Sequence, residues 1–100
     1  MNLDEFKSTL NEVQPPTGLP YSLQALWLDA KKGWQAAHLL VQDHEDDPNC
    51  NWIHAYCHRK EGDLANAGYW YRRAGKPVYG GSLAEEWAAI STALLETARV

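Results

Sequence analysis

The chain has 100 residues, a formal net charge of −4 and 45% hydrophobic residues, as expected for a single globular domain rather than a disordered segment. Its acidic balance and the lack of a long basic stretch argue against nucleic-acid binding, which needs a positively charged surface. A polar, proline-containing beginning argues against a signal peptide, and no apolar run is long enough for a membrane span.

The N-terminal segment has the pattern of a short helix followed by a loop. Leu3, Phe6 and Leu10 recur at helical spacing and predict a helix over residues 1–13. Three prolines and a glycine then interrupt the chain at residues 14–21, where a helix cannot continue. We therefore expect an N-terminal helix that is joined to the rest by a proline-rich loop.

Residues 22–43 are predicted to form a first helical hairpin. Ser22 is a favourable N-cap for a helix that runs to Lys32, and Gly33 ends this helix. A further helix follows over residues 34–43. Because the connection is a single glycine, the two helices are expected to pack antiparallel.

Residues 47–75 are predicted to form a second hairpin. Asp47 followed by Pro48 is a strong helix start, because a carboxylate caps the free N–H groups and proline is favoured in the first turn. Asp63 provides a similar start for the next helix, directly after a turn at Gly62.

The last predicted element is a helix over residues 82–98. Ser82 and Glu85 have the spacing of a capping box. We expect this helix to cover the open face of the second hairpin, as a capping element does in a short helical stack. No segment alternates as a β-strand does. The predicted fold class is therefore all-α, with five or six helices in one domain over residues 1–100.

The second hairpin resembles part of a known helical repeat. Four residues occupy the turn, small-residue and aromatic positions in the second half of a tetratricopeptide repeat: Gly62, Ala67, Tyr71 and Ala74. The resemblance implies stacked antiparallel hairpins and a binding or scaffolding module. The block from Trp52 to Gly75 also resembles a family of small uncharacterised proteins of similar length, and that resemblance implies no activity.

Three histidines stand where the repeat has other residue types. His54 and His58 replace a Leu and a Tyr of the first helix, and His38 replaces a small Ala in the first hairpin. His54 and His58 are four residues apart, so they share one helix face and can bind one metal ion. The pair lacks the His-Glu-x-x-His order, and no Cys-x-x-Cys accompanies it. A transition-metal site and ordinary packing therefore remain alternatives.

His38 also has two interpretations of its own. The tight turn at Gly33 brings its helix beside Asp29, and an Asp29–His38 hydrogen bond is the expected structural role. The functional alternative is a general base oriented by the carboxylate, with Cys57 as a nucleophile.

Charged residues cluster at the two ends of the second helix of the second hairpin: Glu61, Asp63, Arg72 and Arg73. Acidic groups near the N-terminus of a helix and basic groups in its last turn both interact favourably with the helix dipole. We expect these residues to have structural roles that need no ligand.

The aromatic residues are unevenly distributed, with five Trp and five Tyr but one Phe. Such rings suit binding surfaces as well as helix interfaces. We predict a groove for a peptide or a small planar ligand, lined by Trp27, His38, His54, Tyr56 and His58. The alternative is that the rings pack the hairpins together, and surplus aromatic surface then favours a homodimer.

These patterns together predict a non-catalytic module that binds a protein, peptide or small ligand, without nucleic-acid or membrane partners. The alternative is a small metal- or ligand-binding protein, or an enzyme, that uses His54, His58 and His38. No cofactor is expected apart from a transition metal at these histidines. Cys50 and Cys57 are too far apart on one helix to form a disulfide, and free thiols favour a cytoplasmic location.

Overall fold

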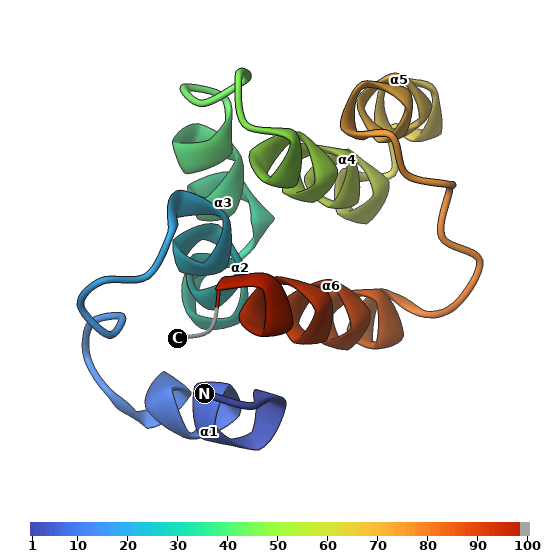
Figure 1. Cartoon of the computed structure of the whole chain (residues 1–100). Coiled ribbons are helices and arrows are strands. Elements are labelled where there is room, and N and C mark those ends of the chain that lie inside the picture. Colours follow the sequence, from blue (N-terminus) through green and yellow to red (C-terminus); the bar gives the residue numbers. More distant parts are fainter. Residues whose placement is uncertain (99–100) are drawn as a thin grey trace.

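The computed structural model of the protein describes residues 1–98, which contain six α-helices and one short 3₁₀ turn (Figure 1). The helices are α1 (Leu3–Ser8), α2 (Tyr21–Lys32), α3 (Trp34–Val41), α4 (Pro48–Glu61), α5 (Leu64–Ala74) and α6 (Leu83–Ala98), and the 3₁₀ turn is Thr9–Asn11. Within the described range no residue lies in a β-strand, so the predicted all-α class is confirmed. No helix in this range is both long and apolar enough to cross a membrane.

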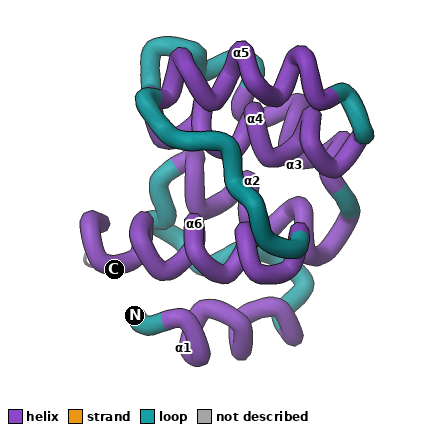
Figure 2. The backbone as a smooth tube through the Cα atoms, turned by 90° about the vertical axis from the view of Figure 1, so that its right-hand side faces the viewer, coloured by secondary structure: helices purple, strands orange, loops and turns teal. Residues whose placement is uncertain are grey.

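The helices form two hairpins that lie side by side. α2 packs against α3, α4 packs against α5, and α3 lies beside α4, so these four helices form one curved row (Figure 1). α6 crosses α2 and α4, and α1 lies on the outer side of α6 (Figure 2). The sequence places the last helix on the second hairpin alone, whereas in the structure it lies against the first helix of both hairpins.

Local capping explains where three of the helices begin. The Asp47 side chain accepts a hydrogen bond from the Asn49 N–H at 2.9 Å, and Pro48 follows in the first turn of α4. Asp63 accepts from the backbone N–H of Asn66 at the start of α5. The Ser82 and Glu85 side chains each accept from the other residue's N–H, at 3.0 and 2.9 Å. These contacts satisfy N–H groups that have no partner within a helix, and they confirm the predicted starts.

The start of α2 differs from the prediction. Ser22 is not the N-cap: α2 begins at Tyr21, after Pro20, and Ser22 is buried inside the first turn. Proline is tolerated at this N-cap position because its missing N–H would have had no partner within the helix. The Gln24 side chain donates to the Leu19 carbonyl oxygen at 2.7 Å and holds the entering chain.

Two helix ends also fall earlier than predicted. α1 ends at Ser8 and continues only as a 3₁₀ turn to Asn11, short of residue 13. α3 ends at Val41 rather than at residue 43, because the N–H of His44 turns back to the Val41 carbonyl oxygen. In both places a tighter turn closes the helix before the chain changes direction.

The main core is formed by α1, α2, α3, α4 and α6. Phe6 of α1 is fully buried and stacks on Trp87 of α6, with ring centroids 5.7 Å apart. Burial of such a ring stabilises the fold by about 1.5–3 kcal/mol. The Trp27 indole N–H donates to the Thr9 hydroxyl at 3.2 Å. The first helix and the 3₁₀ turn after it are therefore held by both packing and a hydrogen bond.

A second, smaller core lies between α4 and α5, formed by Ala55, Ala67, Trp70 and Tyr71. With these rings and those of the main core buried, Tyr21 and Tyr69 are the large exposed aromatics within residues 1–98. The homodimer stays a prediction, but the surplus aromatic surface that suggested it is mostly buried within one chain.

Candidate functional site

Three histidines from two helices meet between α3 and α4. His54 and His58 lie one turn apart on α4, and His38 faces them from α3. The ring centroid of His38 is 4.7 Å from that of His54 and 5.2 Å from that of His58. The centroids of the two α4 rings are 5.0 Å apart. One nitrogen from each ring lies within 4.8 Å of the other two. We call these three residues the histidine cluster.

Two tryptophan rings pack against the histidine cluster. Trp70 of α5 stacks on His54 with centroids 3.8 Å apart and planes inclined by 12°. Trp34 meets His38 edge-on at 6.3 Å, and the Arg73 guanidinium lies 4.9 Å from the Trp70 ring on α5. His54 is only 4% exposed, whereas His38 and His58 are partly accessible. The cluster thus has one buried histidine and two histidines that are accessible to solvent and to a dissolved ligand.

Burial disfavours the charged forms of His54 and His38. Desolvation lowers the pKa of His54 to about 3, and repulsion from His38, His58 and Arg73 adds to the effect. Burial also lowers the pKa of His38, with a contribution from His58, although Glu61 acts in the opposite direction. A neutral imidazole is the form that binds a metal ion.

His54 also carries an unsatisfied polar atom. Its Nδ1 is buried and has no hydrogen-bond partner among the described residues. Leaving a buried polar group without a partner costs about 1–3 kcal/mol, and such groups are rare in native proteins. The arrangement is therefore costly unless something outside the chain completes it.

Glu61 orients one member of the cluster. Its Oε1 lies 2.9 Å from Nδ1 of His58, and this contact leaves Nε2 as the His58 nitrogen available to a ligand. Metal-binding histidines usually make such a contact through their second nitrogen, which fixes the tautomer and raises the basicity of the ligand.

The spacing is close to that of a metal centre without matching it. Tetrahedral zinc, with bonds of about 2.0–2.1 Å, places its ligand nitrogens roughly 3.4 Å apart. The cluster nitrogens lie within 4.8 Å of one another. A bound zinc ion would hold the three nitrogens at this shorter separation, and the two partly accessible rings, His38 and His58, are the ones that would have to move.

A second combination of ligand atoms involves His58, Glu61 and Asp63. Asp63 already accepts hydrogen bonds from the backbone and side-chain N–H groups of Asn66, at 3.2 and 3.0 Å, at the start of α5. Asp63 therefore has the capping role expected of it. The three histidines are the better ligand set because the Nδ1 of His54 has no partner among the described residues and Glu61 engages only Nδ1 of His58.

The predicted Asp29–His38 hydrogen bond is not formed. Asp29 is buried and accepts instead from the Tyr56 hydroxyl at 3.0 Å and from the Lys60 ammonium at 2.9 Å. Asp29 points to the face of α4 that carries Tyr56 and Lys60, whereas His38 lies on the face that carries His54 and His58. The prediction is wrong because it took account of helix proximity and not of helix rotation.

The structure also separates the residues that were expected to line one groove. Trp27 and Tyr56 are 1% and 2% exposed and belong to the main core, which α6 covers. His38, His54 and His58 lie together at a different place, between α3 and α4.

The remaining predicted residues have mostly structural roles. Glu61 contacts His58 rather than the start of α5. Arg72 and Arg73 lie in the last turn of α5, as the dipole argument expects, and Arg73 also pairs with Glu45 at 3.1 Å. Burial raises the pKa of the Cys57 thiol, which argues against a nucleophilic role for this residue.

One buried charge was missed by the sequence analysis. Glu86 of α6 is fully buried, binds the Arg59 guanidinium at 2.9 Å and accepts from the Tyr71 hydroxyl. The available signal was its position four residues before the buried Ile90, which places the carboxylate on the apolar stripe of the helix.

Comparison of this chain with protein-family models, with curated proteins and with solved structures finds no match.

Proposed function

We propose that the protein binds a transition-metal ion through His38, His54 and His58. The observation that carries the proposal is the convergence of three imidazole nitrogens, one from each residue, within 4.8 Å. The buried, unpartnered Nδ1 of His54 supports it, because the site is otherwise incompletely satisfied. The Glu61 contact to His58 supports it as a typical outer-shell carboxylate.

The ligand chemistry favours a particular group of ions. Imidazole suits Zn²⁺, Cu²⁺, Ni²⁺ and iron, whereas Mg²⁺ and Ca²⁺ prefer oxygen ligands. Three protein ligands leave a fourth tetrahedral position open for water or a small molecule. Zn²⁺ is the ion we propose, because it commonly takes three imidazole ligands and one open position, and it needs no redox partner.

The scaffold we propose for this site is a tetratricopeptide-like pair of hairpins. The hairpin of α4 and α5 supports this: Gly62 has a φ of 94° at the turn, where a side chain would be strained. Ala67 packs with Ala55, and Tyr71 fills the space beside them. A cytoplasmic location is part of the same proposal, supported by two buried cysteines that form no disulfide.

Metal titration of chelator-treated protein tests the proposal. We expect one equivalent of Zn²⁺ to bind, with Co²⁺ giving the visible absorption of a tetrahedral complex. His58→Gln should weaken binding by at least about 100-fold, since even outer-shell changes cost about 10–100-fold. His44→Gln is the matched control, because His44 stacks on Tyr21 and lies outside the cluster.

Two results would overturn the metal proposal. One is the absence of stoichiometric Zn²⁺ binding by the wild-type chain. The other is equal Zn²⁺ affinity for wild-type protein and His58→Gln, because binding would then occur elsewhere on the chain.

A further inference from the structure

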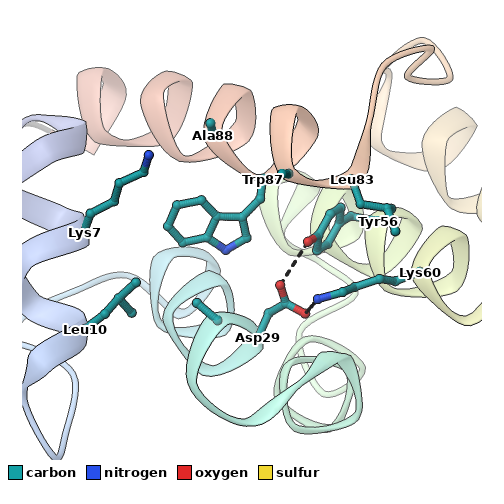
Figure 3. Close-up of a pocket in the computed structure, with 10 residues that line it drawn as sticks. Lys7, Leu10, Asp29, Tyr56, Lys60, Leu83, Trp87 and Ala88 are labelled. Carbon is teal, nitrogen blue, oxygen red and sulfur yellow. Dashed lines mark hydrogen bonds and ion pairs between the residues drawn. The ribbon is translucent and has the colours of Figure 1, made fainter.

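A pocket of about 530 Å³ lies between α1, α2, α4 and α6 (Figure 3). Its volume falls in the range of small-molecule sites. The α4 residues that line it, Tyr56 and Lys60, each follow a cluster histidine by two positions, which is about 200° around the helix. The pocket and the histidine cluster are therefore on opposite faces of α4 and are separate sites.

Most of the pocket wall is apolar. Leu10 of the 3₁₀ turn, Leu83 and Trp87 of α6 and three alanines contribute to the lining. Trp87 is held in place because its indole N–H donates to the Leu26 carbonyl oxygen at 2.9 Å. A fixed aromatic face and aliphatic side chains provide a surface that an apolar ligand body can cover.

The polar groups at one end of the pocket satisfy one another. Both carboxylate oxygens of Asp29 are engaged, one by Tyr56 and the other by Lys60. The Asp29 and Lys60 charges therefore cancel locally, and this end offers little to a ligand that needs several hydrogen-bond partners. A peptide, with its many backbone polar groups, is poorly matched to such a lining.

Lys7 is the uncompensated charge of the pocket. It lies on α1 at the other end of the pocket from Lys60, with Trp87 between them (Figure 3). Within residues 1–98 it takes part in none of the ion pairs. The lining thus has a net charge of +1, from Lys7 and Lys60 against Asp29, and this charge is located beside an apolar wall.

We propose that this pocket binds a monoanionic amphiphile, a molecule with one carboxylate on an apolar chain or ring. The carboxylate pairs with Lys7, and the apolar body lies against Trp87 and Leu83. This binding function goes beyond the proposed metal site and does not depend on it.

Octanoate and 1-octanol are the probes, since they share an apolar chain and differ in charge. They are titrated into isotopically labelled protein with EDTA present, and binding is followed by nuclear magnetic resonance shifts. Octanoate should saturate one site with shifts at the pocket residues, and 1-octanol should bind about five-fold more weakly, as expected for an accessible ion pair worth up to about 1 kcal/mol.

Three variants locate the binding. Lys7→Gln should remove the preference for octanoate, whereas Lys32→Gln, which changes an exposed lysine outside the pocket, should retain it. Ala88→Phe fills the pocket and should prevent binding of both probes, with its spectrum showing whether the fold is intact. The proposal fails if neither probe saturates, if wild-type protein binds both equally, or if Lys7→Gln or a folded Ala88→Phe binds octanoate as wild type does.

Discussion

The imidazole ring of His54 lies flat on the indole ring of Trp70, with centroids 3.8 Å apart. The stack joins α4 to α5 and leaves a fluorescent side chain in contact with a proposed metal ligand. Its two members come from different hairpin helices, so the contact also reports whether the hairpin is closed.

The first prediction uses Trp70 as a reporter of metal binding. Cu²⁺ or Co²⁺ bound to His54 would lie within a few ångströms of the indole and should quench its emission, because open-shell ions accept excitation energy at short range. We expect saturable quenching at one equivalent of metal in the wild-type protein. In Trp70→Phe, the quenched fraction of the total emission should fall, while the metal affinity changes little. Quenching of equal size in both proteins would place the ion away from the cluster.

The second prediction concerns Glu61. Glu61→Gln removes the carboxylate that contacts Nδ1 of His58 and should lower Zn²⁺ affinity by about 10–100-fold. Stability of the metal-free protein should change little, because Glu61 is exposed. Zn²⁺ titrations of this variant and of Glu96→Gln, an exposed acid on α6, provide the comparison. If Asp63→Asn weakens Zn²⁺ binding and Glu61→Gln does not, the carboxylate that supports the metal site is that of Asp63 and not that of Glu61.

The third prediction is a pH dependence of stability in the metal-free protein. Burial lowers the pKa of His54 from 6.5 to about 3, so between these values the unfolded chain binds more protons than the folded chain. The free energy of unfolding should therefore fall as the pH is lowered through this window, by up to about 1.4 kcal/mol per pH unit for one such group. His38 contributes in the same direction, because its pKa is also lowered.

Urea denaturation at several pH values between about 7 and 5 measures this effect. This interval is chosen because the carboxylates titrate below it. His54→Gln should flatten the dependence, and His44→Gln should leave it unchanged. A wild-type protein that becomes more stable on acidification would show that His54 is stabilised in its charged form.

The fourth prediction concerns the buried charge of Glu86. Arg59→Met removes the guanidinium that pairs with Glu86 at 2.9 Å. The Glu86 carboxylate is then fully buried without a cationic partner, which should destabilise the fold by about 3–5 kcal/mol. The double variant Arg59→Met/Glu86→Leu should recover much of this loss, because no charge then remains uncompensated. Urea denaturation of both single variants and the double variant gives the coupling energy. Additive losses would mean that the two side chains act independently.

The starts of α4, α5 and α6 were predictable because their signals act within one turn. An Asp before a proline, an Asp after a glycine and a Ser-x-x-Glu pair each satisfy N–H groups of the adjacent residues. The start of α2 was predicted wrongly for a related reason. Ser22 has the chemistry of a cap, but Pro20 occupies the N-cap position and the helix already begins at Tyr21. Ser22 therefore lies inside the first turn, where it is buried.

The histidine cluster was likewise predictable only in the part that lies within one helix. The i, i+4 spacing of His54 and His58 is a property of one helix and follows from the sequence alone. The arrival of His38 beside them depends on how α3 packs on α4. Glu86 and Lys7 likewise acquire their roles only from the position of α6.

The sequence by itself therefore determined the helices, most of their ends and the pairing of two histidines, because capping and helical periodicity act over a few residues. The tertiary structure decided that Asp29 meets Tyr56 and Lys60 instead of His38, and that His38 completes a three-histidine cluster. These outcomes depend on the rotation of each helix about its axis. That rotation is decided by the packing of side chains distant in the sequence, which bury more apolar surface in one orientation than in the others.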